Sequence, residues 1–127
     1  MKTIPLQTQA EAEWVKEYLL LPLLLDILER DIVHISEDTG LFKFPQIYIL
    51  MLHDIQRQVM LDLTTVRRQL RQNGLKVYEQ HRTALGLEAS YLCRGYEHSF
   101  SILWGLVKAN LEERLCGYMG IDISAQH

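Results

Sequence analysis

A cluster of cations in the middle of the chain could bind an anion. Residues 67–94 carry six arginine or lysine side chains against two carboxylates, a local charge of +4 in a chain whose net charge is −3. Guanidinium groups form paired hydrogen bonds to phosphates, so a nucleic acid could be attracted here. The candidate anion-binding or nucleic-acid-binding residues are Arg67, Arg68, Arg71, Lys76 and Arg82. The simpler interpretation is a solvated helix end whose cations complement the helix dipole.

A second group of reactive side chains follows these cations. Cys93, Glu97 and His98 place a thiol, a carboxylate and an imidazole within six residues. A metal ion needs three or four such ligands to converge, and a nucleophilic cysteine needs a base within hydrogen-bond reach. Because the tight CxxC and HxxxH spacings are absent, we expect no cofactor and rank a metal or thiol site here third. The alternative is a buried structural cysteine and a carboxylate that favours a helix start.

The cations end a long helical pattern whose continuity decides what they can do. Apolar residues recur at spacing 4-3-4 twice over within residues 45–74, which predicts one straight helix with a buried seam. The seam is Tyr48, Leu52, Ile55, Val59, Leu63, Val66 and Leu70. The first turns, Ile47–Leu52, are apolar all round and are expected to be buried on several sides. A break near Asp62–Thr64 would instead give a helix-turn-helix, but the seam keeps its phase through Asp62.

If residues 45–74 form two helices joined by a turn, the segment resembles a known class of fold. A helix, a turn, a short basic helix and a hairpin follow in that order over residues 46–94, which loosely resembles winged-helix DNA-binding domains. The resemblance implies that Thr64 caps a recognition helix and that residues 75–94 form the wing. This alternative predicts a nucleic-acid-binding regulator that uses the arginines.

The segment before residues 45–74 predicts another helix, which would pack antiparallel to the straight helix. Thr8 and Glu11 have the spacing of a capping box, which marks a helix start, and Gly40 is suited to a helix end. Pro22 lacks an amide and predicts a kink or a restart of the helix. Beyond it the apolar residues repeat at spacing 4-3-4-3, typical of packing against a neighbouring helix. They are Leu21, Leu25, Leu28, Ile32 and Ile35.

After Gly74 the spacing of the apolar residues changes from a helical period to alternation. Residues 75–80 and 87–93 alternate apolar and polar side chains, which predicts a β-hairpin over about residues 75–93. Arg94 and Gly95 are expected to close this hairpin.

A C-terminal helix is predicted from about Glu97 to Met119. Its apolar stripe begins at Phe100 and continues through Trp104. Gly105 lies inside the stripe and suggests that another backbone approaches closely there, because glycine costs about 1 kcal/mol in a helix interior.

Length and composition bound the fold class. The chain has 127 residues, 48% of them hydrophobic, which is enough for one domain with one core. The predicted fold is mainly α: long antiparallel helices, the first kinked at Pro22, a small hairpin and a C-terminal helix. We expect a single domain over residues 1–127 in which residues 1–7 and 121–127 are loose ends.

Composition also predicts a compartment. Two cysteines are too few for a disulfide framework, and no secretory signal is recognisable at the start. The densest apolar run is too short to cross a bilayer. We therefore expect a reduced, cytoplasmic protein without a membrane partner.

The favoured functional hypothesis is a non-enzymatic interaction or regulatory protein of bacterial type. No residue pattern predicts catalysis. The amphipathic segments carry more apolar surface than three helices need for one core, so part of it is expected to meet another chain. A homodimer is the simplest such assembly, and a different protein partner is the alternative. A compact monomer whose hairpin covers the surplus also fits the sequence.

Overall fold

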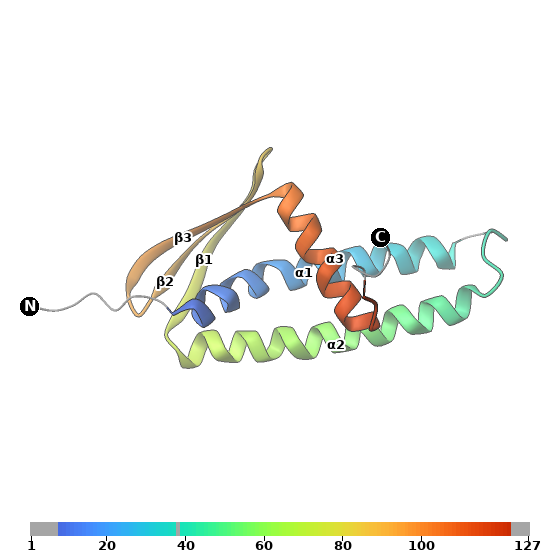
Figure 1. Cartoon of the computed structure of the whole chain (residues 1–127), viewed down its shortest axis with the longest axis horizontal. Helices are drawn as coiled ribbons and strands as arrows, with labels where there is room; N and C mark the ends of the chain where they lie inside the picture. The colour runs from blue at the N-terminus through green and yellow to red at the C-terminus, as the bar shows by residue number, and fades with distance from the viewer. Residues whose placement is uncertain (1–7, 38, 123–127) are drawn as a thin grey trace, which may run out of the picture.

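The computed structural model describes residues 8–37 and 39–122 and is built around a long helical hairpin (Figure 1). In chain order the elements are α1 (Gln9–Ser36), α2 (Pro45–Gln72), three strands and α3 (Trp104–Met119). α1 and α2 lie antiparallel, the sheet lies at one end of the pair, and α3 descends from the sheet onto both helices. The predicted class, mainly α with a small β element, is confirmed.

α1 begins at the predicted capping box. The Thr8 hydroxyl accepts from the Glu11 amide at 3.1 Å, and the Thr8 amide donates to the Glu11 carboxylate at 2.8 Å. The helix runs through Pro22 without a restart, although Pro22 has no amide to donate to the carbonyl of Tyr18. The buried apolar side chains of α1 are Val15, Leu19, Leu20, Leu21, Leu24, Leu28 and Ile32.

α2 is one unbroken helix, which confirms the predicted straight helix. The alternative prediction, a break near Asp62–Thr64, is wrong. Thr64 and Thr65 donate their hydroxyls to the carbonyls of Met60 and Leu61, four residues back, at 2.9 and 3.1 Å. Hydroxyls that bond back in this way belong to a helix interior rather than a cap. The winged-helix resemblance needed a turn at this point and a short helix after it, and neither is present in α2.

The seam of α2 is buried along its length, with one change at its start. The buried residues are Ile49, Leu52, Ile55, Val59, Leu63, Val66 and Leu70. Tyr48, which we predicted at the start of the seam, is exposed, and its ring packs edge-on against Phe42 with centroids 5.8 Å apart. Ile49 replaces it because spacings of three and four both return to the same helix face.

The sheet has three strands rather than the predicted two. β1 (Leu75–Arg82), β2 (Gly86–Cys93) and β3 (Tyr96–Leu103) are antiparallel and lie in that order. Arg94 and Gly95 have φ angles of 50° and 87°, as a tight two-residue hairpin turn requires. They therefore join β2 to β3 instead of closing the sheet.

The prediction of a helix from Glu97 is wrong, because residues 96–103 form β3 and α3 begins at Trp104. Across the sheet Tyr91 lies opposite His98 and Ala89 lies opposite Phe100. Phe100 and Trp104 also fit a helical stripe, since their spacing of four suits a helix face. The alternation of half-buried and exposed residues along β3 is the strand signal that the helical interpretation overlooked.

β2 is the central strand and supplies most of the sheet's buried surface. Its buried side chains are Leu87, Ala89, Tyr91 and Cys93, as the alternation predicted. A Cβ at Gly86 would lie 2.0 Å from the carbonyl oxygen of Ile102, so the backbones of β2 and β3 approach too closely there for any other residue.

α3 packs on the helical hairpin through a narrow apolar face in which Val107 and Leu111 are buried. The close approach predicted at Gly105 is wrong, because nothing outside its own helix lies within 4 Å of a Cβ placed there. The helix ends at Gly120, which adopts the left-handed conformation that favours glycine.

Two further expectations concern the ends of the chain and the membrane. Of residues 1–7 and 121–127, which were predicted to be loose, 1–7 and 123–127 lie outside the residues that the structure describes. Ile121 donates its amide to the carbonyl of Cys116 at 2.9 Å. None of the described helices combines the length and the apolar character that crossing a bilayer requires.

Candidate functional site

Three of the five predicted cations share one depression, which we call the basic pocket. Arg67 and Arg71 from α2 and Lys76 from β1 line a hollow of about 360 Å³ beside Tyr18. The turn at Gly74, with a φ of 71°, reverses the chain so that Lys76 comes beside the end of α2. No carboxylate lines the hollow, and none of these three cations is ion-paired with another described residue. The basic pocket can therefore accept a negatively charged group.

The other two predicted cations lie elsewhere. Arg68 follows Arg67 in α2 but is not part of the pocket lining, because each residue turns the helix by about 100°. Arg82 ends β1 and borders a different hollow of about 390 Å³ between α1 and α3, the α3 groove. The lining of that groove is mostly apolar, with Trp104 and Leu111 among its residues, and it includes charged side chains such as Asp26 and Glu112. The five cations thus do not form one anion-binding surface.

The thiol, carboxylate and imidazole of the second candidate do not converge. Cys93 is buried, and burial raises the pKa of its thiol, which disfavours the nucleophilic thiolate. Glu97 lies opposite Leu92 and therefore on the other face of the sheet from Cys93. His98 stacks on Tyr91 with ring centroids 5.4 Å apart, and its Nε2 has no hydrogen-bond partner among the described residues.

Within residues 8–37 and 39–122, no three His, Cys, Asp or Glu side chains gather closely enough to hold an ion.

A buried carboxylate joins the start of α1 to the turn between β2 and β3. Arg94 donates from both terminal nitrogens to Glu11, at 2.5 and 3.2 Å, and also to the carbonyl of Asn73 at 3.1 Å. The Arg94 backbone amide donates to the carbonyl of Gly74 at 2.7 Å. The hydrogen bonds from Arg94, and then that from the Thr8 amide, lower the pKa of Glu11 to about 2. All of these groups are used in holding elements together.

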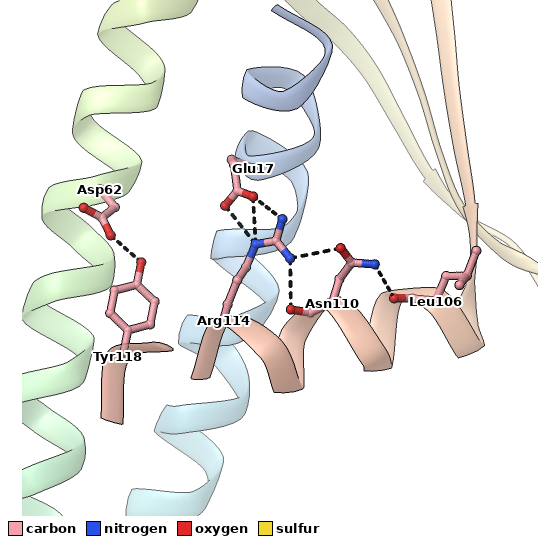
Figure 2. Close-up of polar contacts among 6 residues, drawn as sticks. All are labelled: Glu17, Asp62, Leu106, Asn110, Arg114 and Tyr118. Atoms are coloured by element: carbon pink, nitrogen blue, oxygen red, sulfur yellow. Dashed lines mark hydrogen bonds and ion pairs between the residues drawn. The ribbon is translucent and has the colours of Figure 1, made fainter. Parts of the chain in front are cut away.

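Two polar contacts, shown in Figure 2, attach α3 to the helical pair, one to α1 and one to α2. Arg114 donates through Nε to both carboxylate oxygens of Glu17, at 2.8 and 2.9 Å. Its Nη1 donates to the carbonyl of Asn110 at 2.9 Å. The Tyr118 hydroxyl donates to Asp62 at 2.5 Å. Burial, with the Asp62 hydrogen bond next, raises the pKa of Tyr118, so its hydroxyl stays protonated. These contacts position α3 on α1 and α2.

The outer side of α2 carries apolar side chains that no other described element covers. Leu50 and Leu61 expose 67% and 70% of their surface, and Ile47 exposes 61%. With Asp54 and Arg57 they recur at spacing 3-4-3-4, on the helix face opposite the buried seam. We call these five residues the α2 stripe. Because the buried seam of α2 faces α1, the stripe lies on the side of α2 that is turned away from α1.

A shallow hollow of about 570 Å³ runs beside the α2 stripe. Its lining residues all belong to α2, and they are His53, Gln56, Arg57, Met60, Leu61 and Thr64. A ridge of side chains from another helix could enter such a groove.

Residues 6–123 match the protein family described as YhjD protein. The chain belongs to the YhjD protein family. The match covers both long helices, the sheet and α3. No curated protein and no solved structure shows a significant match to the chain.

In this member of the YhjD protein family the apolar surface extends past the start of α2. Leu41 and Phe44, in the connection between α1 and α2, are exposed, as is Met51 in the second turn of α2. The expectation that Ile47–Leu52 would be buried on several sides is therefore wrong for the single chain. Only Ile49 and Leu52 in that segment are buried.

The α2 stripe was not among the residues predicted from the sequence. The predicted seam of this YhjD-family chain contains only positions that face α1; Ile47 and Leu50 were expected to be buried within Ile47–Leu52, and Leu61 was not assigned. The signal that could have found the stripe is a second 3-4 repeat on the opposite face, interrupted only by Asp54 and Arg57.

Proposed function

We propose that this protein is a non-enzymatic interaction module of the cytoplasm that associates with itself through the α2 stripe. The observation that carries the proposal is the exposure of Leu50 and Leu61 on one helix face, continuous with exposed Ile47. Exposed apolar side chains gathered on one face mark interaction sites on soluble proteins, and here they flank the charged pair Asp54 and Arg57. Because α1 occupies only one side of α2, a second helix can pack on the other side without disturbing the core.

The polar clusters support a role without catalysis. Glu11 and Arg94 pair with each other, and Glu17 pairs with Arg114, so their charges serve the packing of elements. Cys93 is buried as a thiol. Cys93 and Cys116 are both free, which fits the reducing cytoplasm.

Replacing one exposed leucine tests the proposal. We expect Leu61→Glu to weaken self-association at least about tenfold, because a carboxylate in the contact must lose its hydration. The fold should be unchanged, since Leu61 is exposed in the single chain. Sedimentation equilibrium over a concentration series measures the effect, with circular dichroism as the check on folding.

Leu85→Glu is the matched control, because Leu85 is equally exposed but lies in the turn between β1 and β2. It should associate as tightly as the wild type. Equal association of the Leu61 and Leu85 variants would count against the α2 stripe as the contact surface.

A second candidate function is the binding of a nucleic acid or another anionic partner at the basic pocket. It is supported by the convergence of Arg67, Arg71 and Lys76 around one hollow without a carboxylate. Duplex DNA is the probe. We expect binding that weakens steeply with salt, because each neutralised phosphate releases counterions.

Paired substitutions separate this candidate from unspecific attraction. Arg67→Gln combined with Arg71→Gln should lower the slope of log affinity against log salt by about two. Arg68→Gln removes a cation from the same helix turn but not from the pocket, and it should have a smaller effect. The absence of salt-sensitive binding at micromolar concentration would rule out nucleic acid as the partner.

A further inference from the structure

We propose that the α2 stripes of two copies pack antiparallel about a two-fold axis that passes between Asp54 and Arg57. This inference rests on the proposed self-association and adds the partner's orientation and register. A two-fold axis makes an interface self-complementary, so each residue must find its counterpart within the same stripe. The α2 stripe, extended by one position to Thr64, has this property when read in opposite directions from the midpoint between Asp54 and Arg57.

The apolar positions match under this symmetry. With the axis midway between residues 54 and 57, Leu50 lies opposite the partner's Leu61, and Leu61 lies opposite the partner's Leu50. Ile47 lies opposite the partner's Thr64, whose methyl group offers apolar contact. The most exposed leucines of α2 thus cover one another at both ends of the contact.

The charged positions match as well. Asp54 lies opposite the partner's Arg57, and the symmetric pair repeats this contact on the other side of the axis. Within one chain these two groups form an exposed ion pair at 2.8 Å, with side chains 57% and 73% exposed. Such surface pairs contribute little to stability, so they can rearrange to bridge two chains at little cost.

A parallel arrangement does not share this complementarity. It would place Asp54 beside the partner's Asp54 and Arg57 beside the partner's Arg57, and like charges in contact disfavour association. The charges at the centre of the stripe therefore select the antiparallel orientation.

The spacing of the stripe suits two helices that pack side by side. Ile47, Leu50, Asp54, Arg57 and Leu61 follow a 3-4-3-4 repeat, the pattern of helices that interlock along a narrow seam. Thr64 and Arg68 continue the repeat for another turn. The hollow beside the stripe provides room for side chains of the partner helix.

Reversing the charges tests the pairing at the axis. Asp54→Arg alone and Arg57→Asp alone should each weaken self-association at least about tenfold, because four like charges then meet. An equimolar mixture of the two variants should regain wild-type association, since every pair across the axis is again opposite in sign. A mixture no stronger than either variant alone would overturn the proposal.

Cysteine cross-linking tests the register, on a Cys116→Ser background that leaves only buried Cys93. A mixture of Leu50→Cys and Leu61→Cys chains should form a disulfide between the two variants, whereas Leu50→Cys alone should not. In the antiparallel dimer two copies of residue 50 stand about 16 Å apart along the helix, too far for a disulfide. Cross-linking of Leu50→Cys with itself in a dimeric protein would overturn the register while leaving self-association intact. A strictly monomeric wild type would overturn both.

Discussion

Glu11 is a buried carboxylate whose contacts reach three elements. It caps α1, receives two hydrogen bonds from Arg94 and so connects to the end of α2 through the Asn73 carbonyl. The capping role was predictable from Thr8 and Glu11 because it involves residues three apart. The partnership with Arg94 was not, since the two lie 83 residues apart in the chain and only the fold brings them together.

Removing this charge should destabilise the fold. We expect Glu11→Gln to lower the free energy of unfolding by about 2 kcal/mol at pH 7, because Arg94 loses a charged partner. Urea unfolding followed by circular dichroism measures the loss. Glu88→Gln, at an exposed position of β2, is the control and should change the free energy by less than about 0.5 kcal/mol.

The same residue predicts how stability responds to acid. In the folded protein the pKa of Glu11 is lowered to about 2 from an ordinary value of 4.5. The ionised carboxylate therefore stabilises the fold fully above about pH 4.5, and this contribution is lost as the pH falls towards 2. The difference in stability between the wild type and Glu11→Gln should narrow over that range. A difference as large at pH 3 as at pH 7 would contradict the role of the charge.

At the scale of elements, local and repeated patterns predicted structure best. The buried seam of α2 repeats over many turns. The helix could therefore be predicted as continuous even though the polar residue Asp62 suggested a break. β3 is only eight residues long, and Phe100 fits both a strand and a helix. Its identity depends on hydrogen bonds to β2, a neighbour that the sequence alone did not assign to it.

The contact between β2 and β3 can be tested at its tightest point. Gly86→Ala should lower stability by at least about 2 kcal/mol, because its Cβ would lie 2.0 Å from a carbonyl oxygen that is fixed in the backbone. Gly117→Ala is the matched substitution in α3, where nothing outside the helix lies within 4 Å. It should raise stability by up to about 1 kcal/mol. Thermal unfolding of both variants would show shifts in opposite directions, and a harmless Gly86→Ala would contradict the strand pairing.

At the scale of the whole molecule, the candidate surfaces depended on which residues the fold brings together. The sequence grouped five cations, but only three share the basic pocket. Arg82 stands six residues from Lys76 along β1, about 20 Å away in an extended strand. Counting charges within a segment could not reveal this separation.

For the α2 stripe, the sequence shows the residues but not which of them the fold leaves exposed. Its residues were visible in the sequence, yet their meaning depends on knowing that α1 covers the opposite face and that no described element covers this one. A large part of the exposed apolar surface lies on α2 and the adjoining connection, which is where we propose the contact. The homodimer remains a prediction, and the α2 stripe is the contact surface that we propose for it.

The most direct test of self-association is the mass of the wild-type protein in solution from micromolar to millimolar concentration. Analytical ultracentrifugation should show a mass that rises with concentration from the 14.9 kDa of one chain towards twice that value, where it should level off. The plateau at two chains follows from a closed two-fold contact. A mass that stays at 14.9 kDa throughout, or that grows without a limit, would contradict a dimer formed through the α2 stripe.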